Sequence, residues 1–349
     1  MSNTAIRVNH LTKQYDSFTA IEDVSLNVKE QEILVLLGNS GCGKTTLLRT
    51  IAGLERPNDG EVYLDGHLVS GNGTFVAPER RQIGMVFQDY ALFPHLSVAE
   101  NIEFALKGWN NRDKRARTQD MLTLVGLDGL DKRFPHQLSG GQQQRIALAR
   151  ALAAEPSVVL LDEPFSNLDA ALRKFMREEV RRILTEAGAT AIFVTHDQEE
   201  AMSIADRVAV LRAGRLLQVG TPLELYRHPE VRDVAVFLGE ANMLRGVAHG
   251  DTVETTFGML PLARVAHGKV EVMVRPEAIS LQPDENGEGE VVDVRYFGYY
   301  QLASVKLQSG AVILARVWAQ TDAEPGSRVS NRVEGDAVTF PVPARQTTG

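Results

Sequence analysis

Short, wholly apolar runs alternate with amphipathic segments up to about residue 240. The runs cover residues 33–37, 83–87, 158–161 and 192–194. Continuous apolar runs of this length are typical of parallel strands that are covered on both faces. A helical pattern between two of the runs is formed by Leu172, Met176, Val180 and Ile183, with Asp169 in the capping position. The alternation predicts an α/β domain with a mostly parallel sheet.

Turn-forming residues mark a hairpin near residues 60–70. Gly60 precedes the apolar positions Val62 and Leu64, and Asp65 and Gly66 follow them. Because aspartate and glycine tolerate the backbone angles of tight turns, we expect two antiparallel strands here.

The pattern changes after Gly239. Short strand-like runs at residues 270–274, 291–296, 302–307 and 312–317 are separated by Gly, Asp and Pro, with no long helical pattern between them. Such spacing predicts a separate all-β domain of about 110 residues, a small barrel or sandwich. We therefore expect two domains, at residues 1–239 and 240–349.

The composition is that of a globular protein and narrows the functional classes. The 349 residues are 44% hydrophobic and 23% charged, with a net charge of −8 and one cysteine, Cys42, which can form no intrachain disulfide. The acidic balance argues against nucleic-acid binding, and we interpret the basic run at residues 112–117 as a solvated helix face. The first ten residues are polar, and no apolar run approaches the roughly 20 residues that span a membrane. A membrane role would therefore require a partner.

The most specific motif is a glycine-rich loop between a predicted strand and a predicted helix. Its sequence, Gly-Asn-Ser-Gly-Cys-Gly-Lys-Thr at residues 38–45, fits the pattern G-x-x-x-x-G-K-[ST] of a P-loop. Glycines let backbone N–H groups turn toward phosphate oxygens, and the following helix adds the positive end of its dipole. In this interpretation Lys44 reaches the β- and γ-phosphates and the Thr45 hydroxyl binds Mg²⁺. The expected phosphate-binding residues are Gly38, Asn39, Ser40, Gly41, Cys42, Gly43, Lys44, Thr45 and Thr46.

Polar side chains also follow the other apolar runs. Gln88 follows the second run, Asp162 and Glu163 follow the third, and His196 lies just beyond the fourth. Ligands of open parallel sheets bind at the carboxyl ends of strands, so these side chains should meet beside the P-loop. For phosphoryl transfer, Asp162 and Gln88 would join Thr45 at Mg²⁺. Glu163 would activate the attacking water with help from Gln88, and His196 would hydrogen-bond the γ-phosphate.

A second glycine-containing motif, Leu-Ser-Gly-Gly-Gln at residues 138–142, opens a predicted helix. Because a serine before two glycines at a helix start forms an anion site, we expect anion binding at Ser139, Gly140, Gly141 and Gln142. This segment, placed between the P-loop and the acidic strand end, resembles the signature of ABC-type ATPases. Residues that resemble that family's A-loop, Q-loop, D-loop and switch histidine follow in order: Tyr15, Gln88, residues 166–169 and His196. The Tyr15 ring would stack on adenine, and the resemblance covers essentially all of residues 1–240.

The resemblance implies an ATPase that acts as a pair. In the family, ATP lies between the P-loop of one subunit and the signature of the other, so this chain would need a second copy. Closure on ATP and Mg²⁺, and reopening after hydrolysis, would drive an integral membrane permease whose coupling helices face residues 89–101. The resemblance further implies a nucleotide-binding domain at residues 1–239 with a helical subdomain at about 89–157.

Residues 275–279, Arg-Pro-Glu-Ala-Ile, resemble a hallmark of the oligomer-binding-like C-terminal extension of importer ATPases for sugars, polyamines, sulfate and ferric ion. In that group the extension contributes dimer contacts and regulation. Residues 39–49 most resemble bacterial ferric-ion importers. The resemblance thus implies an ATP-hydrolysing subunit for ferric iron import, with a separate permease and, indirectly, a solute-binding protein. The chain would lie peripherally on the cytoplasmic face of the inner membrane, with no nucleic-acid partner.

Other functions stay open as alternatives. The same resemblance fits the ATPase of a sugar, polyamine or sulfate importer. A soluble ABC ATPase of DNA repair or translation would carry a coiled coil or two ATPase domains, and the sequence indicates neither. A P-loop GTPase would need an Asn/Thr-Lys-x-Asp segment, whereas residues 12–15 end in tyrosine. A small-molecule kinase leaves the motif at residues 138–142 unexplained.

Overall fold

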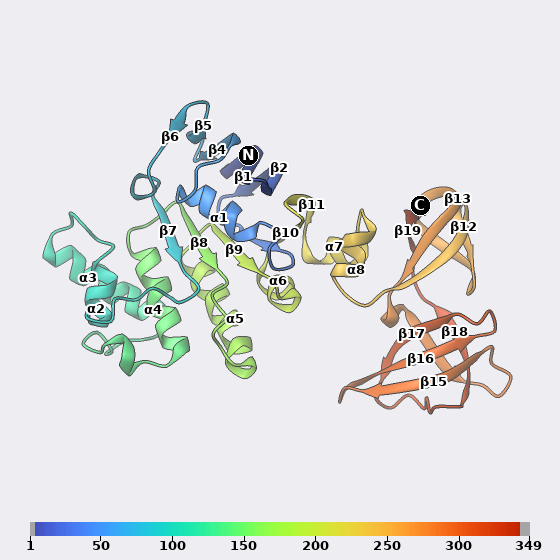
Figure 1. Ribbon diagram of the computed structural model, residues 1–349. Coiled ribbons are helices and arrows are strands. Elements are labelled where there is room, and N and C mark those ends of the chain that lie inside the picture. Colours follow the sequence, from blue (N-terminus) through green and yellow to red (C-terminus); the bar gives the residue numbers. More distant parts are fainter. Residues whose placement is uncertain (1–3, 343–349) are drawn as a thin grey trace. The chain divides into compact units, whose positions relative to one another are not determined.

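Two units divide the chain, residues 1–222 and 223–349, and the computed structural model describes residues 4–342. Figure 1 shows mixed helices and sheets in the first unit and mostly strands in the second. The predicted fold class, an α/β domain followed by an all-β domain, is confirmed. The predicted domain boundary at 239–240 stays a prediction. Contacts group residues 223–239 with the second unit, but contacts do not show to which functional domain these residues belong.

The first unit is built on a six-stranded sheet in the order β11-β10-β3-β9-β8-β7. Its strands are β3 (Ile33–Leu37), β7 (Ile83–Val86), β8 (Val158–Asp162), β9 (Ala191–Thr195), β10 (Arg207–Arg212) and β11 (Arg215–Gly220). Neighbours are parallel except in the β10–β11 hairpin. Strands β3, β8 and β9 are buried at every residue, which explains their continuous apolar sequences. The run predicted at residues 83–87 is one residue too long, since Phe87 is exposed and lies outside β7.

An antiparallel sheet in the order β2-β1-β4-β5-β6 forms a second layer. Its strands are β1 (Thr4–Tyr15), β2 (Phe18–Lys29), β4 (Asp59–Leu64), β5 (His67–Gly71) and β6 (Thr74–Phe75). Strands β4 and β5 confirm the predicted hairpin. The long strands β1 and β2 were not predicted, because register shifts interrupt their pairing and blur the period of two.

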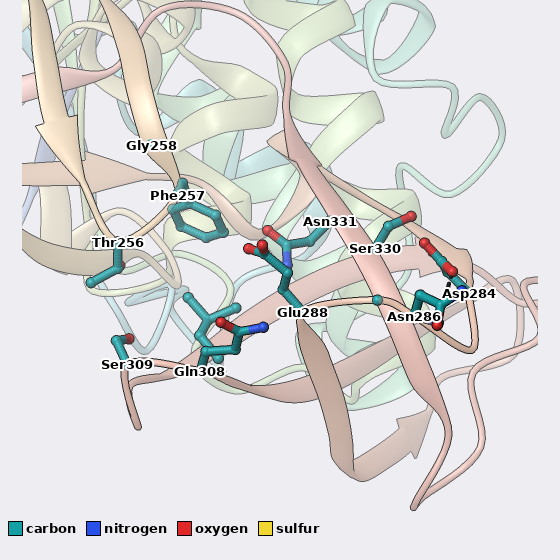
Figure 2. A pocket seen from close by; sticks show the side chains of 12 residues that line it. Thr256, Phe257, Gly258, Asp284, Asn286, Glu288, Gln308, Ser309, Ser330 and Asn331 are labelled. Carbon is teal, nitrogen blue, oxygen red and sulfur yellow. Dashed lines mark hydrogen bonds between the residues drawn. The ribbon is translucent and has the colours of Figure 1, made fainter.

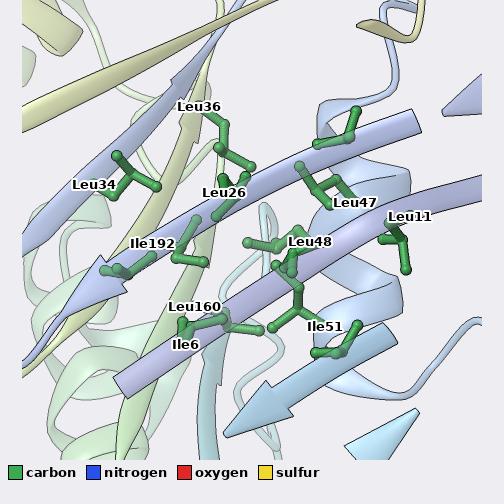
Figure 3. Close-up of a cluster of buried hydrophobic side chains, with 14 of the residues drawn as sticks. Ile6, Leu11, Leu26, Leu34, Leu36, Leu47, Leu48, Ile51, Leu160 and Ile192 are labelled. Atoms are coloured by element: carbon green, nitrogen blue, oxygen red, sulfur yellow. The ribbon is translucent and has the colours of Figure 1, made fainter. Parts of the chain in front are cut away.

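Helix α1 (Lys44–Ala52) lies between the two sheets. Its side chains Leu47, Leu48 and Ile51 are fully buried, and each contributes on the order of 1.5–3 kcal/mol of burial free energy. Figure 3 shows them among side chains of both sheets, including Leu34, Leu36, Ile192, Ile6 and Leu26. The P-loop ends on the first residues of α1, so the core that holds α1 in place also fixes the end of the loop.

The other helices of the first unit are α2 (Val98–Glu103), α3 (Asn111–Leu124), α4 (Gly140–Ala153), α5 (Ala170–Glu186) and α6 (Gln198–Ile204), with 3-10 turns at Pro78–Arg80 and Pro135–Gln137. Helices α2, α3 and α4 pack on one another within the segment expected to form a helical subdomain, and α4 packs on the edge strand β7. The Asp169 side chain accepts a hydrogen bond from the Leu172 N–H at 2.9 Å, so the predicted cap of α5 is confirmed.

The interpretation of residues 112–117 as a solvated face is wrong for one residue. Arg112 and Arg115 are exposed, but the Arg117 guanidinium donates to the carbonyl oxygens of Leu152 and Ala153. The physical reason is that the last carbonyl groups of α4 lack partners within the helix, and a long cationic side chain on the neighbouring α3 reaches them.

The second unit consists of two antiparallel sheets after two short helices, α7 (Pro222–Arg227) and α8 (Arg232–Phe237). The three-stranded sheet, in the order β12-β13-β19, contains β12 (Asn242–Thr255), β13 (Gly258–Val274) and β19 (Val338–Pro341). The five-stranded sheet, in the order β14-β18-β15-β16-β17, contains β14 (Ile279–Pro283), β15 (Gly289–Tyr296), β16 (Tyr300–Leu307), β17 (Val312–Trp318) and β18 (Arg328–Val333). The four predicted runs lie in β13, β15, β16 and β17, whereas the other strands were not predicted.

Arg275 of the Arg-Pro-Glu motif is buried in the second unit, just before a 3-10 turn at Pro276–Ala278. Its guanidinium group lies over the Tyr226 ring, 4.1 Å from the centroid. It donates at 3.0–3.2 Å to the carbonyl oxygens of Ala235, Gly239, Glu240 and Tyr226. The motif therefore ties the segment of α7 and α8 to the β-rich part of this unit.

No helix among the described residues 4–342 has both the length and the apolar character needed to cross a membrane.

Arg81 ties α1 to the antiparallel sheet from a buried position. Its guanidinium donates at 2.7–3.2 Å to Val69 O, Ser70 Oγ, Val76 O, Thr50 O and Ile51 O. The last two carbonyl groups belong to the final turn of α1. Burial lowers the pKa of Arg81 to about 10, so the group stays charged at neutral pH.

Replacing Arg81 by methionine should lower the free energy of unfolding of the first unit by about 3 kcal/mol, because five acceptors lose a charged donor. Urea denaturation followed by circular dichroism measures the change. Arg80→Met is the matched control: Arg80 is exposed, and its loss should cost less than about 0.5 kcal/mol. Equal stability of the two variants would show that the Arg81 network contributes nothing.

Candidate functional site

The strand ends that carry the predicted polar residues lie level with one another. The register pairs Leu37 with Thr195, Val194 with Asp162, and Leu161 with Val86. The carboxyl ends of β3, β9, β8 and β7, which are neighbours in this order, therefore meet at one edge of the sheet. The P-loop starts at that edge. The strands that end there are followed by His196, Glu163 and Gln88.

The glycine-rich loop joins β3 to α1 and leaves no room for side chains at two of its glycines. Gly43 is the N-cap of α1 with φ +102°, and a Cβ atom there would lie 2.3 Å from the Ala20 carbonyl oxygen. At Gly38 a Cβ atom would lie 2.3 Å from the Leu211 carbonyl oxygen. The close backbone approach, and at Gly43 also the left-handed conformation, require glycine.

Lys44 is buried at the first position of α1. Its Nζ donates to the carbonyl oxygens of Gly38 at 2.7 Å and Asn39 at 3.1 Å, so the ammonium group lies inside the curl of the loop. Cys42 is buried nearby, with its Sγ 3.9 Å from Lys44 Nζ, and burial raises the pKa of the thiol. The thiol is therefore protonated at neutral pH and acts as a small apolar group in the loop.

Thr45 and Asp162 form a pair of oxygen ligands at this edge. Thr45 Oγ1 donates to Asp162 Oδ1 at 3.1 Å. Burial raises the pKa of Asp162, an effect that the hydrogen bond from Thr45 and the charge of Arg49 oppose. The described residues contain no group of three or more His, Cys, Asp or Glu side chains that could hold a metal by itself. A single carboxylate with a hydroxyl fits Mg²⁺, which takes few protein ligands and shares its shell with phosphate oxygens.

Glu163 and His196 face each other at the ends of β8 and β9. Glu163 Oε2 lies 3.2 Å from His196 Nδ1, and the Glu163 side chain is 22% exposed, so its carboxylate can meet water. The Glu163 backbone has φ +44°, and its N–H donates to the Val194 carbonyl oxygen at 3.1 Å. A non-glycine residue in this conformation costs about 1–3 kcal/mol, which is typical of positions that point a functional side chain.

Gln88 lies in an exposed turn after β7. The Tyr90 N–H closes this turn by donating to the Phe87 carbonyl oxygen at 2.9 Å. The Gln88 carbonyl oxygen accepts a hydrogen bond from Asn167 Nδ2 at 3.0 Å. This bond joins the Q-loop to the D-loop, residues 166–169, a contact that the sequence did not predict.

Tyr15 ends β1 at the turn into β2, and 40% of this residue is exposed. The Nζ of Lys13 lies 4.7 Å from the centroid of the Tyr15 ring. The ring is thus held at the surface in a position where a flat base could stack on it.

Residues 138–142 cap α4. Ser139 is the N-cap: its Oγ accepts from the Gln142 N–H at 3.4 Å, while Gln142 Oε1 accepts from the Ser139 N–H at 2.9 Å. Gly141 packs on α5, since a Cβ atom there would lie 3.0 Å from Met176 Sδ. Within the described residues, no hydrogen bond of Ser139 or Gln142 reaches the P-loop. A single chain therefore brings Thr45 of the P-loop together with Asp162, and Glu163 together with His196. The signature segment instead forms the hydrogen bonds of Ser139 and Gln142 at the start of α4.

Two arginines that sequence reasoning missed bind loops of the site. Arg173 of α5 donates to the Leu168 carbonyl oxygen at 3.1 Å and lies 3.7 Å from Asp197 Oδ2, next to His196. Arg150 of α4 donates to carbonyl oxygens in the segment that follows Gln88. No local signal could have identified them, because arginine on an amphipathic helix is also typical of a solvated face.

The second unit contains a polar pocket of about 400 Å³. Figure 2 shows Glu288 and Asn331 in it beside the Phe257 ring. None of the predicted site residues lines this pocket, and its lining has no lysine or arginine. It therefore lacks the cations expected of a nucleotide site.

Comparisons with known proteins place the chain in a family. An ABC transporter domain matches residues 21–166, and a TOBE domain matches residues 272–344. The chain is similar to the Fe(3+) ions import ATP-binding protein FbpC 1 of Rhodococcus jostii (strain RHA1), with 46% identity over 97% of this chain and 99% of the relative. It is also similar to the sulfate/thiosulfate import ATP-binding protein CysA of Xanthomonas campestris pv. campestris, with 48% identity over 81% of this chain and 83% of the relative.

A solved structure agrees with this placement. The chain is similar to the dimeric ATP-binding cassette MJ0796 bound to ADP and Pi, with 33% sequence identity and a TM-score of 0.54. The match covers 62% of this chain and 98% of the MJ0796 chain. With the P-loop, the acidic strand end and a full-length relative at 46% identity, the chain belongs to the ABC transporter family as an ATP-binding protein.

Proposed function

We propose that the chain is the ATP-hydrolysing subunit that energises import through a separate membrane permease, with ferric iron as the cargo. The observation that carries the ATPase part is the cluster at the sheet edge. Glu163 lies 3.2 Å from His196 and follows directly on Asp162, which bonds Thr45 of the P-loop helix at 3.1 Å. A base, a metal-binding pair and a phosphate loop are the parts that nucleotide hydrolysis requires.

The proposed chemistry follows from these positions. The phosphates would bind the P-loop N–H groups, and Lys44 would exchange the carbonyl oxygens of its own loop for β- and γ-phosphate oxygens. Thr45 and Asp162, with Gln88, would hold Mg²⁺, which supplies charge neutralisation to the phosphates when bound.

The attacking water would be oriented by Glu163, whose carboxylate accepts a proton as the new P–O bond forms and the bond from the γ-phosphorus to ADP breaks. His196 Nδ1 lies 3.2 Å from the Glu163 carboxylate, which leaves Nε2 for the γ-phosphate; donation to both acceptors at once requires a proton on each ring nitrogen. This assignment gives the strained Glu163 backbone a function, because the strained turn directs the carboxylate.

A second copy of the chain would complete each site. The signature at Ser139–Gln142 has no bond to the P-loop of its own chain among the described residues, and the similar MJ0796 cassette is dimeric. A head-to-tail pair would bring the start of α4 and Gly140 to the γ-phosphate held by the partner, which suits an anion at a helix N-terminus.

The permease would dock in a groove of the first unit. The groove has a volume of about 690 Å³, and its lining includes Met85, Phe87, Ala91, Phe104 and Arg150. Phe87 and Phe104 are 36% and 44% exposed, so the groove offers two aromatic rings to a partner. The groove borders the segment 89–101 that the family resemblance assigns to coupling helices. The chain would therefore lie peripherally at the cytoplasmic face of the inner membrane.

The cargo is proposed from relatives rather than from the site. The relative that matches almost the whole chain is named for Fe(3+) import, and the sulfate/thiosulfate relative is slightly more identical over a shorter span. Ferric iron is therefore the first candidate, and sulfate import is the second. The TOBE-domain match at residues 272–344 fits the regulatory role expected for the C-terminal part.

Replacing Glu163 by glutamine should leave ATP binding unchanged and lower kcat for hydrolysis about 10²–10⁴-fold, because the base is lost and the shape is kept. Phosphate release and binding of a fluorescent ATP analogue measure the two properties. Glu199→Gln is the matched control: this side chain is 85% exposed on the neighbouring α6, and kcat should stay within twofold. Full turnover in the Glu163 variant would refute its assigned role.

In the Glu163→Gln background, ATP with Mg²⁺ should convert the chain to a dimer, because the closed pair persists when hydrolysis is blocked. Light scattering after size exclusion measures the mass. Adding Ser139→Arg should abolish the dimer and leave nucleotide binding to the single chain intact, since Ser139 would contact only the partner's nucleotide. A dimer that tolerates Ser139→Arg would contradict the head-to-tail arrangement.

Affinity purification of tagged Glu163→Gln chain from native membranes with ATP and Mg²⁺ should recover a membrane-spanning permease and an associated solute-binding protein. Binding of ferric ion, and not of sulfate, to that solute-binding protein is the expected outcome. Preference for sulfate would support the second cargo, and recovery of soluble partners alone would leave the ATPase and overturn the transport role.

A further inference from the structure

We propose that Arg150 is a positioning residue for hydrolysis: from the last turn of the signature helix it holds the backbone turn that carries Gln88. The inference rests on the proposed ATPase function and adds a residue that the family motifs and the sequence analysis leave without a role. It concerns α4, the segment 87–93 and the D-loop, all within the first unit.

The segment after Gln88 has an unfavourable backbone conformation. Tyr90 has φ +62° and Ala91 has φ +45°, so two successive non-glycine residues are left-handed. Each such residue costs about 1–3 kcal/mol and persists only where the surroundings enforce it. The Tyr90 side chain is buried, and its hydroxyl has no hydrogen-bond partner, so this hydroxyl does not anchor the turn. Among hydrogen bonds, those that hold this turn therefore act on its backbone.

Arg150 provides that anchor. Its Nη1 atom donates to the Ala91 carbonyl oxygen at 2.7 Å and its Nη2 atom donates to the Tyr90 carbonyl oxygen at 2.9 Å. The guanidinium carbon also lies 5.7 Å from the centroid of the Phe93 ring. No carboxylate within the described residues forms an ion pair with Arg150, so the two carbonyl groups and the ring are the partners that direct its charge.

The other side of the turn is also fixed. The Tyr90 N–H donates to the Phe87 carbonyl oxygen, and Asn167 of the D-loop donates to the Gln88 carbonyl oxygen at 3.0 Å. Gln88 therefore sits between an anchor on the D-loop and an anchor on the signature helix. Because Ser139 caps the start of α4, the same helix would contact the partner's nucleotide at one end and hold the Q-loop at the other.

The position of Arg150 decides which kinetic constant it affects. It bonds the backbone beyond Gln88, and none of its hydrogen bonds is made to Lys44, Thr45 or Asp162. Loss of the two guanidinium hydrogen bonds should misplace Gln88 where it helps to orient the attacking water, whereas Lys44, Thr45 and Asp162 still hold the nucleotide with Mg²⁺, so ATP binding should change little. Such a change lowers kcat at constant KM.

The test replaces Arg150 by lysine, which keeps the charge but cannot donate to two carbonyl groups from one planar fork. We expect kcat of the full-length chain to fall about tenfold, with KM for ATP within about twofold. Arg145→Lys is the matched control, because Arg145 lies on the same helix and donates to a carbonyl oxygen of another loop, Val125, at 2.9 Å. Its kcat should stay within about twofold of the wild type.

Two further measurements separate positioning from a general structural role. In the Gln88→Ala background, Arg150→Lys should lower kcat by less than about twofold, because Arg150 acts on hydrolysis through the position of the Gln88 side chain. Amide hydrogen exchange should accelerate at residues 88–92 in Arg150→Lys and not in Arg145→Lys. An undiminished tenfold effect without Gln88, or unchanged exchange at residues 88–92, would overturn the inference. A wild-type chain that hydrolyses no ATP would refute the proposed function instead, and the exchange measurement would then decide the role of Arg150 alone.

Discussion

The register of the parallel sheet is the constraint on which the site depends. The pairing of Leu37 with Thr195 and of Val194 with Asp162 places the ends of three strands at one level. A strand rises about 3.3 Å per residue, so a slip of β8 by one residue would remove Asp162 from Thr45 and turn its side chain to the other face. The register is enforced because every residue of β3, β8 and β9 is buried, so a slipped strand would have to repack both layers.

Arginines that bond carbonyl groups connect elements within each of the two units. Arg81 binds the end of α1, Arg150 binds the Q-loop, Arg173 binds the D-loop, and Arg275 binds the α7–α8 segment of the second unit. A planar guanidinium group with five N–H donors can satisfy several backbone acceptors at once. A buried cation is tolerated where such acceptors replace its water. These contacts join loops and helix ends through hydrogen bonds instead of covalent links.

The sequence predicts what local chemistry decides. The P-loop, the cap at Asp169 and the fully buried strands follow from residue type and spacing, and the polar residues after each strand follow from the rule for parallel sheets. The strands β1 and β2 could not be predicted, because bulges break their alternation. The roles of Arg117 and Arg150 depend on carbonyl groups that are distant in sequence, and an isolated helix pattern contains no information on them.

The two glycines of the signature differ in their physical role, and this difference explains why one chain leaves the segment open. Gly141 is buried against Met176, so its small size serves packing between α4 and α5. Gly140 is exposed at the helix start, where the first four N–H groups of a helix lack partners within it. Ser139 satisfies only one of them, the N–H of Gln142. The remaining donors, together with the helix dipole, favour an anion from outside the chain, and the proposed partner-held γ-phosphate supplies it.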